Sequence, residues 1–267
     1  MSASVRTVAR VTGYQLRDVL RSRTLLAYGA FFLLVTEALL RFSGGDARAL
    51  LSLMSVVLWV VPLVTLIYGT VYLYNAREFT ELLLAQPVGR GQLFAGLYLG
   101  LALPLALGVV VGVGVPVLMT GVEEPAQRAA LATLLAVAAA LTAVFTAIAF
   151  CIALRFEDRL KGLGAAIAVW LAASVLYDGL VLLVVSAFAD YPLERAVLGL
   201  TLANPLDLAR VALMLRFDVS ALMGYTGAVF QRFFGGVVGT SVVASALAFW
   251  IAAPVAAGVR LFRRKDF

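Results

Sequence analysis

The chain has 267 residues, of which 63% are hydrophobic and 13% are charged, and its mean hydropathy is +1.01. Soluble domains contain about 45–50% apolar and about 25% charged residues. This composition therefore excludes a soluble globule, a disordered chain and a coiled coil. The net charge of +6 alone could indicate nucleic-acid binding, but a surface this apolar would aggregate in water. We therefore expect an integral membrane protein with no nucleic-acid partner.

The residue types needed for several kinds of catalysis are missing. The sequence has no histidine and one cysteine, Cys151, which excludes an intrachain disulfide and Ser–His or Cys–His chemistry. Its only lysines are Lys161 and Lys265, and neither belongs to a Gly-x-x-x-x-Gly-Lys-[Ser/Thr] phosphate-binding loop. We expect no catalytic residue, no metal site and no cofactor bound by this chain.

Six apolar segments are long enough to cross a bilayer. A spanning helix needs about 20 apolar residues, and these runs are continuous rather than alternating, which excludes a β-barrel. The sequence thus predicts an all-α membrane protein, with residues 1–267 forming a single transmembrane domain. The predicted spans are 24–40, 49–74, 93–119, 129–154, 164–187 and 235–259.

The distribution of arginine and lysine predicts the orientation of these spans. Fourteen basic residues fall on the side of the N-terminus, the loops after the second and fourth spans, and the C-terminal tail, and seven fall on the other side. Basic residues favour the cytoplasmic side, so both termini are expected in the cytoplasm. The first span is expected to be an uncleaved helix rather than a signal peptide, because 23 residues precede its apolar run.

The N-terminal segment predicts an amphipathic helix over residues 5–22, before the first span. Four arginines share one face of this helix and apolar residues occupy the opposite arc: Arg6, Arg10, Arg17 and Arg21. Such a helix lies in the membrane interface. Anchoring to membrane lipids explains the pattern, and contact with a cytoplasmic partner is the alternative.

The connection after the second span is longer than a loop requires. Arg77, Glu78 and Glu81 form a charged helical face, and Phe79 with the leucines at 82–84 forms an apolar one. Pro87 ends this helix, and a glycine-rich turn containing Arg90 leads into the third span. We expect the helix to be held against another surface.

Two acidic residues lie inside predicted spans, where an ionised carboxylate costs about 2.5–3.5 kcal/mol on insertion scales. Glu37 is four residues from Arg41 and can pair with it. Asp178 has no basic neighbour in sequence, so it must face the bundle interior, be protonated or meet a partner from another helix. If both acids carried protons, the chain would instead be an ion-coupled secondary carrier.

Residues 188–234 form a long predicted extracytoplasmic loop. Within it, Asn204 is a helix N-cap, Pro205 occupies the first helical position and Asp207 lies in the first turn. A short outer helix carrying Arg210 is therefore expected between the fifth and sixth spans, lying on the membrane or capping the bundle.

The segment from Arg77 to Arg90 resembles the part of ABC-2-type transporter permeases in which charged residues are followed by leucines and Pro-x-x-Arg. In that family the segment docks on a cytoplasmic P-loop ATPase, which binds ATP and Mg²⁺. The resemblance implies a non-enzymatic permease subunit, with this segment as its coupling helix. It also makes the next cytoplasmic loop a second contact, although the residues of that loop by themselves favour a solvated turn. The implied ATPase-coupling residues are Arg77, Glu78, Glu81, Pro87, Arg90, Glu157, Asp158 and Arg159.

Four further motifs resemble one subgroup, the permeases of copper-processing ABC transporters that accompany nitrous-oxide reductase maturation. They are Asn204–Arg210, Leu176–Asp178, Pro87–Gly91 and Phe262–Phe267. The subgroup implies a homodimer in the prokaryotic cytoplasmic membrane, with two ATPase subunits and a periplasmic β-helix partner on the outer loop, where Asn204, Pro205, Asp207 and Arg210 would contribute. The methionines are scattered and predict no copper(I) site. The sequence does not select among three possible substrates, which are copper, a sulfur species and a lipid-like molecule. Mechanical signalling without transport is a fourth alternative.

Overall fold

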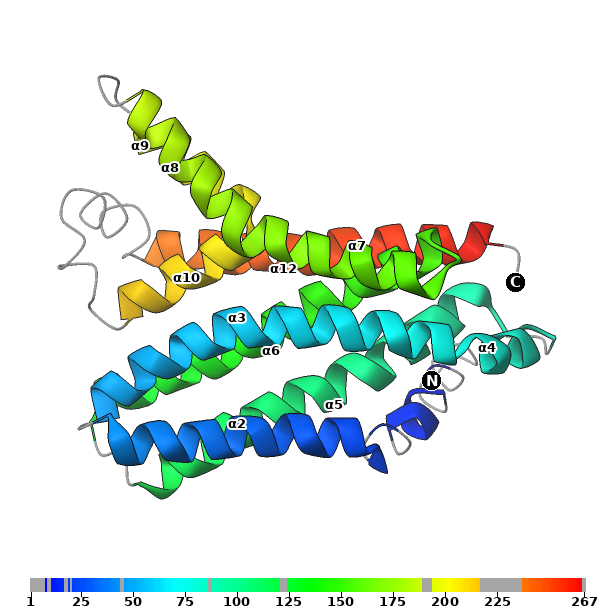
Figure 1. The fold of residues 1–267 in the computed structure, drawn as a ribbon, viewed down its shortest axis with the longest axis horizontal. Helices are drawn as coiled ribbons and strands as arrows, with labels where there is room; N and C mark the ends of the chain where they lie inside the picture. Colours follow the sequence, from blue (N-terminus) through cyan, green and yellow to red (C-terminus); the bar gives the residue numbers. More distant parts are fainter. Residues whose placement is uncertain are drawn as a thin grey trace.

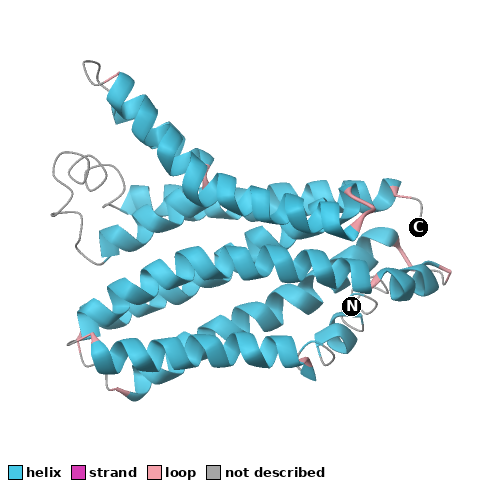
Figure 2. Ribbon diagram, in the orientation of Figure 1, coloured by secondary structure: helices cyan, strands magenta, loops and turns pink. Residues whose placement is uncertain are grey.

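The computed structural model describes residues 8, 11–16, 19, 21–43, 46–85, 88–120, 124–188, 194–216 and 237–265. All regular secondary structure in these residues is helical, as Figure 2 shows. The helices are α2 (Arg23–Phe42), α3 (Asp46–Asn75), α4 (Arg77–Leu84), α5 (Arg90–Met119), α6 (Pro125–Arg155), α7 (Arg159–Leu171), the π-helical turn η1 (Ala172–Leu176), α8 (Tyr177–Ala187), α9 (Glu194–Ala203), α10 (Pro205–Arg216) and α12 (Val237–Arg264). Most of the long helices run side by side in one bundle, whereas α8 and α9 point away from it together (Figure 1).

Six of these helices are long and apolar enough to cross a membrane, which confirms the prediction of six apolar helices of spanning length. They are α2, α3, α5, α6, the continuous helix α7–η1–α8, and α12. The chain is therefore a multi-pass membrane protein. The observed helices extend up to five residues beyond the predicted apolar limits, because charged residues such as Arg90 and Arg264 continue the helices outside the apolar stretch.

The first described residues and the last turn of α12 lie at the same end of the bundle (Figure 1). We call this the termini end, and the opposite end the far end. The connections from α3 to α5 and from α6 to α7 also lie at the termini end. An even number of crossings produces this arrangement, as the sequence predicts.

Helix α6 forms the centre of the bundle and packs against α3, α5, α7, α10 and α12. Of its most apolar stretch, 61% is buried, and Leu134, Val144 and Phe150 are completely buried. In α7–η1–α8 the corresponding share is 6%. An apolar helix of 29 residues with so little internal packing needs an apolar environment. The outward-facing side chains of this helix therefore account for much of the high apolar content of the chain.

The N-terminal segment packs across α5, where two glycines permit close approach. A Cβ at Gly96 would lie 2.6 Å from Val11, and one at Gly100 would lie 2.5 Å from Gln15. The Tyr72 hydroxyl donates a 2.6 Å hydrogen bond to the side-chain oxygen of Gln15. Helix is present at residues 11–16, but the predicted arginine face at positions 6, 10 and 17 falls outside the described residues, so the amphipathic interfacial helix remains a prediction.

Helices α9 and α10 form a pair that is bent by 112° at Asn204. Helix α10 does not lie on the surface of the bundle, because it packs against α6, α12 and α3. Leu206, Leu208 and Ala209 on this helix are at most 2% exposed. The predicted helix thus exists with the predicted start, and it forms part of the bundle because its apolar side is buried against α6.

Candidate functional site

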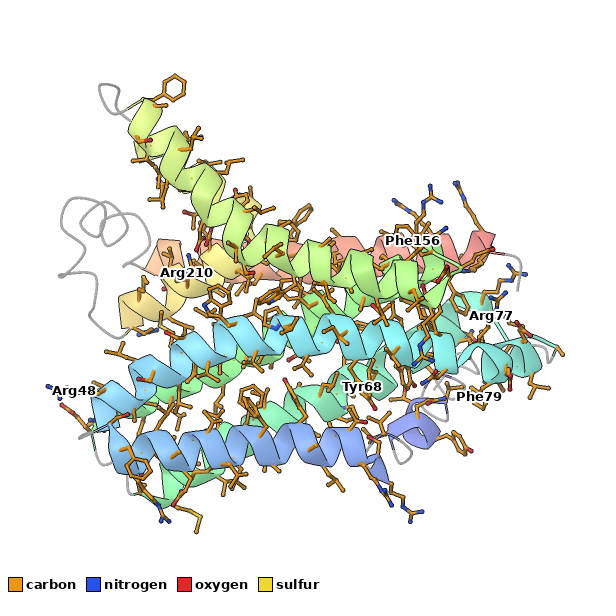
Figure 3. The ribbon with its side chains drawn as sticks, viewed as in Figure 1. Arg48, Tyr68, Arg77, Phe79, Phe156 and Arg210 are labelled. Carbon is orange, nitrogen blue, oxygen red and sulfur yellow. The ribbon has the colours of Figure 1, made fainter. Side chains whose placement is uncertain are left out.

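Helix α4 projects from the termini end between α3 and α5 (Figures 1 and 3). Only Thr80 is buried in this eight-residue helix, and its hydroxyl donates a 2.7 Å hydrogen bond to the Ala76 carbonyl. The Phe79 ring stacks on Tyr14 at a centroid distance of 5.8 Å. Leu82, in contrast, is 70% exposed. Helix α4 therefore has one side held to the chain and one side that presents both charged and apolar groups outward.

Some of the predicted coupling residues of this segment are paired with other residues of the chain, and others are not. The Arg77 Nε lies 3.2 Å from Glu81 Oε1, in an exposed i,i+4 pair. Glu78 is exposed and forms no salt bridge among the described residues. Pro87 lies outside the described residues. Glu78 and Leu82 are thus the groups of α4 that are free to contact a partner.

Arg90 joins α5 to the end of α12. Its Nη1 donates hydrogen bonds to the carbonyls of Arg263, at 2.9 Å, and Lys265, at 3.0 Å. Cations at the last carbonyls of a helix stabilise its C-terminus. Arg90 is therefore engaged inside the chain, and the sequence motif alone gave no sign of this bond across 173 positions.

Lys265 connects the end of α12 to the end of α6, a role that the sequence analysis missed. Its Nζ donates a 3.0 Å hydrogen bond to the Leu154 carbonyl. Partial burial lowers the pKa of Lys265 from its ordinary value, Arg77 lowers it further and Glu157 opposes the shift. Lys265 directly follows the last residue of α12, and a cation at the C-terminal end of a helix was the available sequence signal. Helix α4, the α6–α7 loop and the end of α12 therefore share one electrostatic environment.

The α6–α7 loop is fixed by Tyr74 at the end of α3. The Tyr74 hydroxyl donates to the Phe156 carbonyl at 2.8 Å. A Cβ at Gly162 would overlap that hydroxyl, so glycine is required for the approach. Asp158 caps α7 by accepting a 2.8 Å hydrogen bond from the Leu160 N–H.

The three predicted coupling residues of this loop thus fall into two groups. Asp158 has a structural role as the N-cap of α7. Glu157 and Arg159 are exposed and form no salt bridge in the described part of the chain. Glu78, Leu82, Glu157 and Arg159 are thus four exposed side chains at the termini end, and we refer to these four residues as the candidate docking face.

A second polar cluster lies where α8 meets α10. Arg210 Nη1 is 2.9 Å from Asp178 Oδ1 and 3.0 Å from Asp207 Oδ1. The Asn204 amide donates to the Ala173 carbonyl in η1 at 2.8 Å. Asp178 therefore meets a partner from another helix, one of the alternatives left open by the sequence.

The same cluster fixes the bend between α9 and α10. The Leu206 N–H donates to Asn204 Oδ1 at 3.0 Å, which is the predicted N-cap interaction. The Tyr177 hydroxyl donates to the Leu200 carbonyl at 2.7 Å, which joins α8 to α9. Two carboxylates share one guanidinium here, so the cluster carries a net negative charge when Asp178 and Asp207 are both ionised.

Glu37 and Asp178 are held in separate ion pairs. Glu37 Oε1 accepts hydrogen bonds from Arg41 Nη2 at 2.6 Å and from Arg41 Nε at 2.8 Å, in an exposed pair on α2. Asp178 pairs with Arg210 instead. The expected Glu37–Arg41 pairing is thus confirmed, and these contacts do not bring the two acids into one site.

In the described residues, no group of three or more histidine, cysteine, aspartate or glutamate side chains could hold a metal ion. The Cys151 thiol lies 3.2 Å from the Pro254 carbonyl, between α6 and α12. It is therefore engaged in a contact between two helices. No family model matches the chain, and no curated protein matches it.

Proposed function

We propose that this chain is the membrane-spanning subunit of an ABC-2-type transporter, driven by ATP hydrolysis in a separate P-loop ATPase. The observation that carries the proposal is α4, a short helix that joins two spans directly, lies at the end rich in basic residues, and presents Glu78 and Leu82 outward. A connector of this form suits contact with a soluble protein, because it offers charged groups together with an apolar side chain, the mixture of polar and apolar surface found in non-obligate interfaces.

The contacts around α4 support transmission of movement from the candidate docking face. Helix α4 joins α3 to α5 along the chain, and Arg90 links α5 to α12. Tyr74 links α3 to the α6–α7 loop. Displacement of α4 by an ATPase would therefore act on α3, α5, α12 and the α6–α7 loop at once. In this proposal the chain binds no nucleotide, and ATP and Mg²⁺ belong to the partner.

The positive-inside distribution supports a cytoplasmic location of the termini end. The resemblance to copper-processing permeases extends the proposal to a homodimer in the prokaryotic cytoplasmic membrane that serves copper-centre assembly of nitrous-oxide reductase. A periplasmic β-helix partner would then meet the far end, near the α9–α10 pair. These finer assignments rest on the four sequence motifs alone.

The candidate docking face is tested by site-specific photo-crosslinking in native membranes. A photoreactive residue replaces Glu78 or Leu82, and a matched control replaces Glu124, an exposed acid at the far end. We expect crosslinks to a P-loop ATPase from the first two positions and none from Glu124. The double variant Glu78→Gln/Leu82→Ser should co-purify at least about fivefold less ATPase activity than Glu124→Gln. Undiminished co-purification with the double variant contradicts the proposal.

An ion-coupled secondary carrier is the alternative function, and one observation favours it. Asp178 and Asp207 share the single cation Arg210, so the cluster can accept a proton or a cation. In a carrier, Asp178→Asn abolishes transport and nucleotide depletion does not. In the ATP-driven transporter, depletion abolishes transport while Asp178→Asn reduces it at most through stability.

A further inference from the structure

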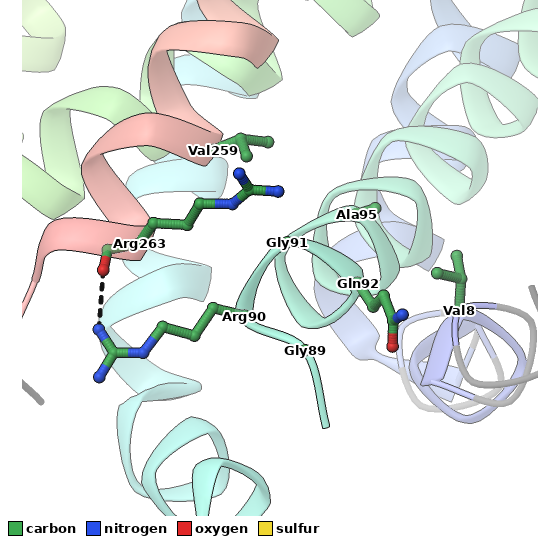
Figure 4. A pocket seen from close by; sticks show the side chains of 8 residues that line it. All are labelled: Val8, Gly89, Arg90, Gly91, Gln92, Ala95, Val259 and Arg263. Atoms are coloured by element: carbon green, nitrogen blue, oxygen red, sulfur yellow. Dashed lines mark hydrogen bonds between the residues drawn. The ribbon is translucent and has the colours of Figure 1, made fainter. Parts of the chain in front are cut away.

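An open cleft of about 470 Å³ lies at the termini end, between the start of α5, the end of α12 and the N-terminal segment (Figure 4). Its polar lining consists of Arg90, Arg263 and Gln92, and no carboxylate is among the described residues that line it. Its apolar lining is formed by Val8, Ala95 and Val259. The cleft thus combines positive charge with an apolar wall.

The two arginines of the cleft have different roles. Arg90 Nη1 is engaged with the carbonyls at the end of α12. The guanidinium of Arg263 has no hydrogen-bond or salt-bridge partner among the described residues, and it lies against the first residues of α5 (Figure 4). A Cβ at Gly91 would lie 3.0 Å from Arg263 Nη2. The absence of a side chain at Gly91 therefore leaves the space that this guanidinium occupies.

The position of the cleft selects the kind of anion. Ala95 and Val259 belong to helices that can span the membrane, and Arg263 lies in the last turn of α12. The apolar stretches of these two helices begin at residue 93 and end at residue 259, so the cleft is expected at the level of lipid phosphates, just outside the hydrocarbon layer. A lipid placed there would bring its phosphate to the guanidinium and its acyl chain to the apolar wall.

We infer that this cleft binds the phosphate of a phospholipid with a net negative charge. A zwitterionic lipid is disfavoured, because its cationic headgroup would meet two arginines and no acid among the described residues of the lining. The inference rests on the chain being a membrane protein and does not depend on the proposed ATPase. It assigns Arg263 to the lipid and Arg90 to the end of α12.

The test uses the full chain, purified in detergent and titrated with phosphatidylglycerol, with bound lipid counted by native mass spectrometry. Arg263→Gln should weaken binding at least about tenfold, because one charged hydrogen-bond donor is lost. Arg264→Gln removes the same charge from the next residue, which does not line the cleft, and should change binding less than about twofold. Gly91→Leu fills the cleft without changing charge and should weaken binding as Arg263→Gln does.

Two further titrations identify the source of the phosphate. Phosphatidylcholine should bind at least about tenfold more weakly than phosphatidylglycerol, and millimolar inorganic phosphate should not displace the lipid. Equal losses in Arg263→Gln and Arg264→Gln overturn the inference, as does equal binding of the two lipids or displacement by inorganic phosphate. If the Arg263→Gln variant does not fold, the Gly91→Leu variant provides the test. Undiminished phosphatidylglycerol binding by Gly91→Leu would show that the cleft is not the lipid site.

Discussion

Asp178 in α8 and Arg210 in α10 form an ion pair in which Oδ1 and Nη1 are 2.9 Å apart, although 32 positions separate the two residues in the chain. A carboxylate within an apolar helix is costly when it has no partner. Here the partner comes from the bent helix pair, which packs against the bundle. The pair therefore explains why Asp178 is tolerated and provides a polar contact between α8 and α10.

Loss of the cation should destabilise the protein more than loss of one anion. Arg210→Gln leaves Asp178 and Asp207 without their shared partner, whereas Asp178→Asn leaves the Arg210–Asp207 pair intact. We expect Arg210→Gln to lower the free energy of unfolding by about 1.5–3 kcal/mol, and Asp178→Asn by about 1 kcal/mol or less. Melting temperatures of the detergent-solubilised variants measure the difference.

The double variant Asp178→Asn/Arg210→Gln provides the control for this pair. If the two residues interact directly, its melting temperature should lie above the value obtained by adding the two single effects. Strict additivity would show that each side chain acts independently of the other.

Alanine at position 162 is expected to be less destabilising when the facing hydroxyl is removed, although two ring carbons of Tyr74 would still lie 2.9 Å from the new Cβ. Gly162→Ala places a methyl group on the Tyr74 hydroxyl and displaces it from the Phe156 carbonyl. We expect a loss of stability of about 1–3 kcal/mol, which is typical of overpacking. Tyr74→Phe alone should cost about 1 kcal/mol.

The double variant Tyr74→Phe/Gly162→Ala should be more stable than Gly162→Ala alone, because the overlapping oxygen is gone. Thermal unfolding followed by intrinsic fluorescence measures all three variants. A double variant less stable than Gly162→Ala would show that the overlap is not the cause of the destabilisation.

Substitutions of two neighbouring acids in the α6–α7 loop should have different effects, one on stability and the other on binding of the ATPase. Asp158→Ala removes the N-cap of α7 and should lower stability by about 1 kcal/mol. Glu157→Gln should leave the melting temperature within about 1 °C, because this exposed side chain forms no salt bridge among the described residues. On the proposed function, only Glu157→Gln should reduce ATPase co-purification at matched amounts of folded chain. A reversed pattern would exclude Glu157 from the candidate docking face.

The orientation of the bundle can be measured with single cysteines. Cys151→Ser provides a background without thiols and retains a hydrogen-bond donor toward the Pro254 carbonyl. In intact cells, a membrane-impermeant maleimide should label Glu124→Cys and not Leu82→Cys. In inside-out vesicles the labelling should reverse. Labelling of Leu82→Cys in intact cells would place the termini end outside and contradict the positive-inside assignment.

The six long helices could be predicted from the sequence, because a span is a local property. About 20 consecutive apolar residues are sufficient for a spanning helix, whatever packs against it. The start of α10 was also predictable, since the cap at Asn204 depends on neighbours within the same turn. The short helix α4 was predictable for the same reason, from the pattern of charges and leucines between residues 77 and 84.

The hydrogen-bond partners of the candidate site residues could not be predicted from the sequence. Arg77 and Arg90 belong to the same motif, yet Arg90 bonds to carbonyls 173 and 175 positions away. Likewise, the composition of the α6–α7 loop cannot separate the cap Asp158 from its exposed neighbour Glu157, because the distinction depends on which N–H groups each carboxylate reaches.

The composition of this chain thus determined that it is a helical membrane protein. The order of its charged residues predicted which end of the bundle faces the cytoplasm. Only the tertiary structure decided that α10 is buried in the bundle, that Arg210 neutralises Asp178, and that Arg263 faces an open cleft. Hydropathy along a chain determines where helices enter an apolar layer, whereas the pairing of charges depends on which helices pack together, and that information is not local.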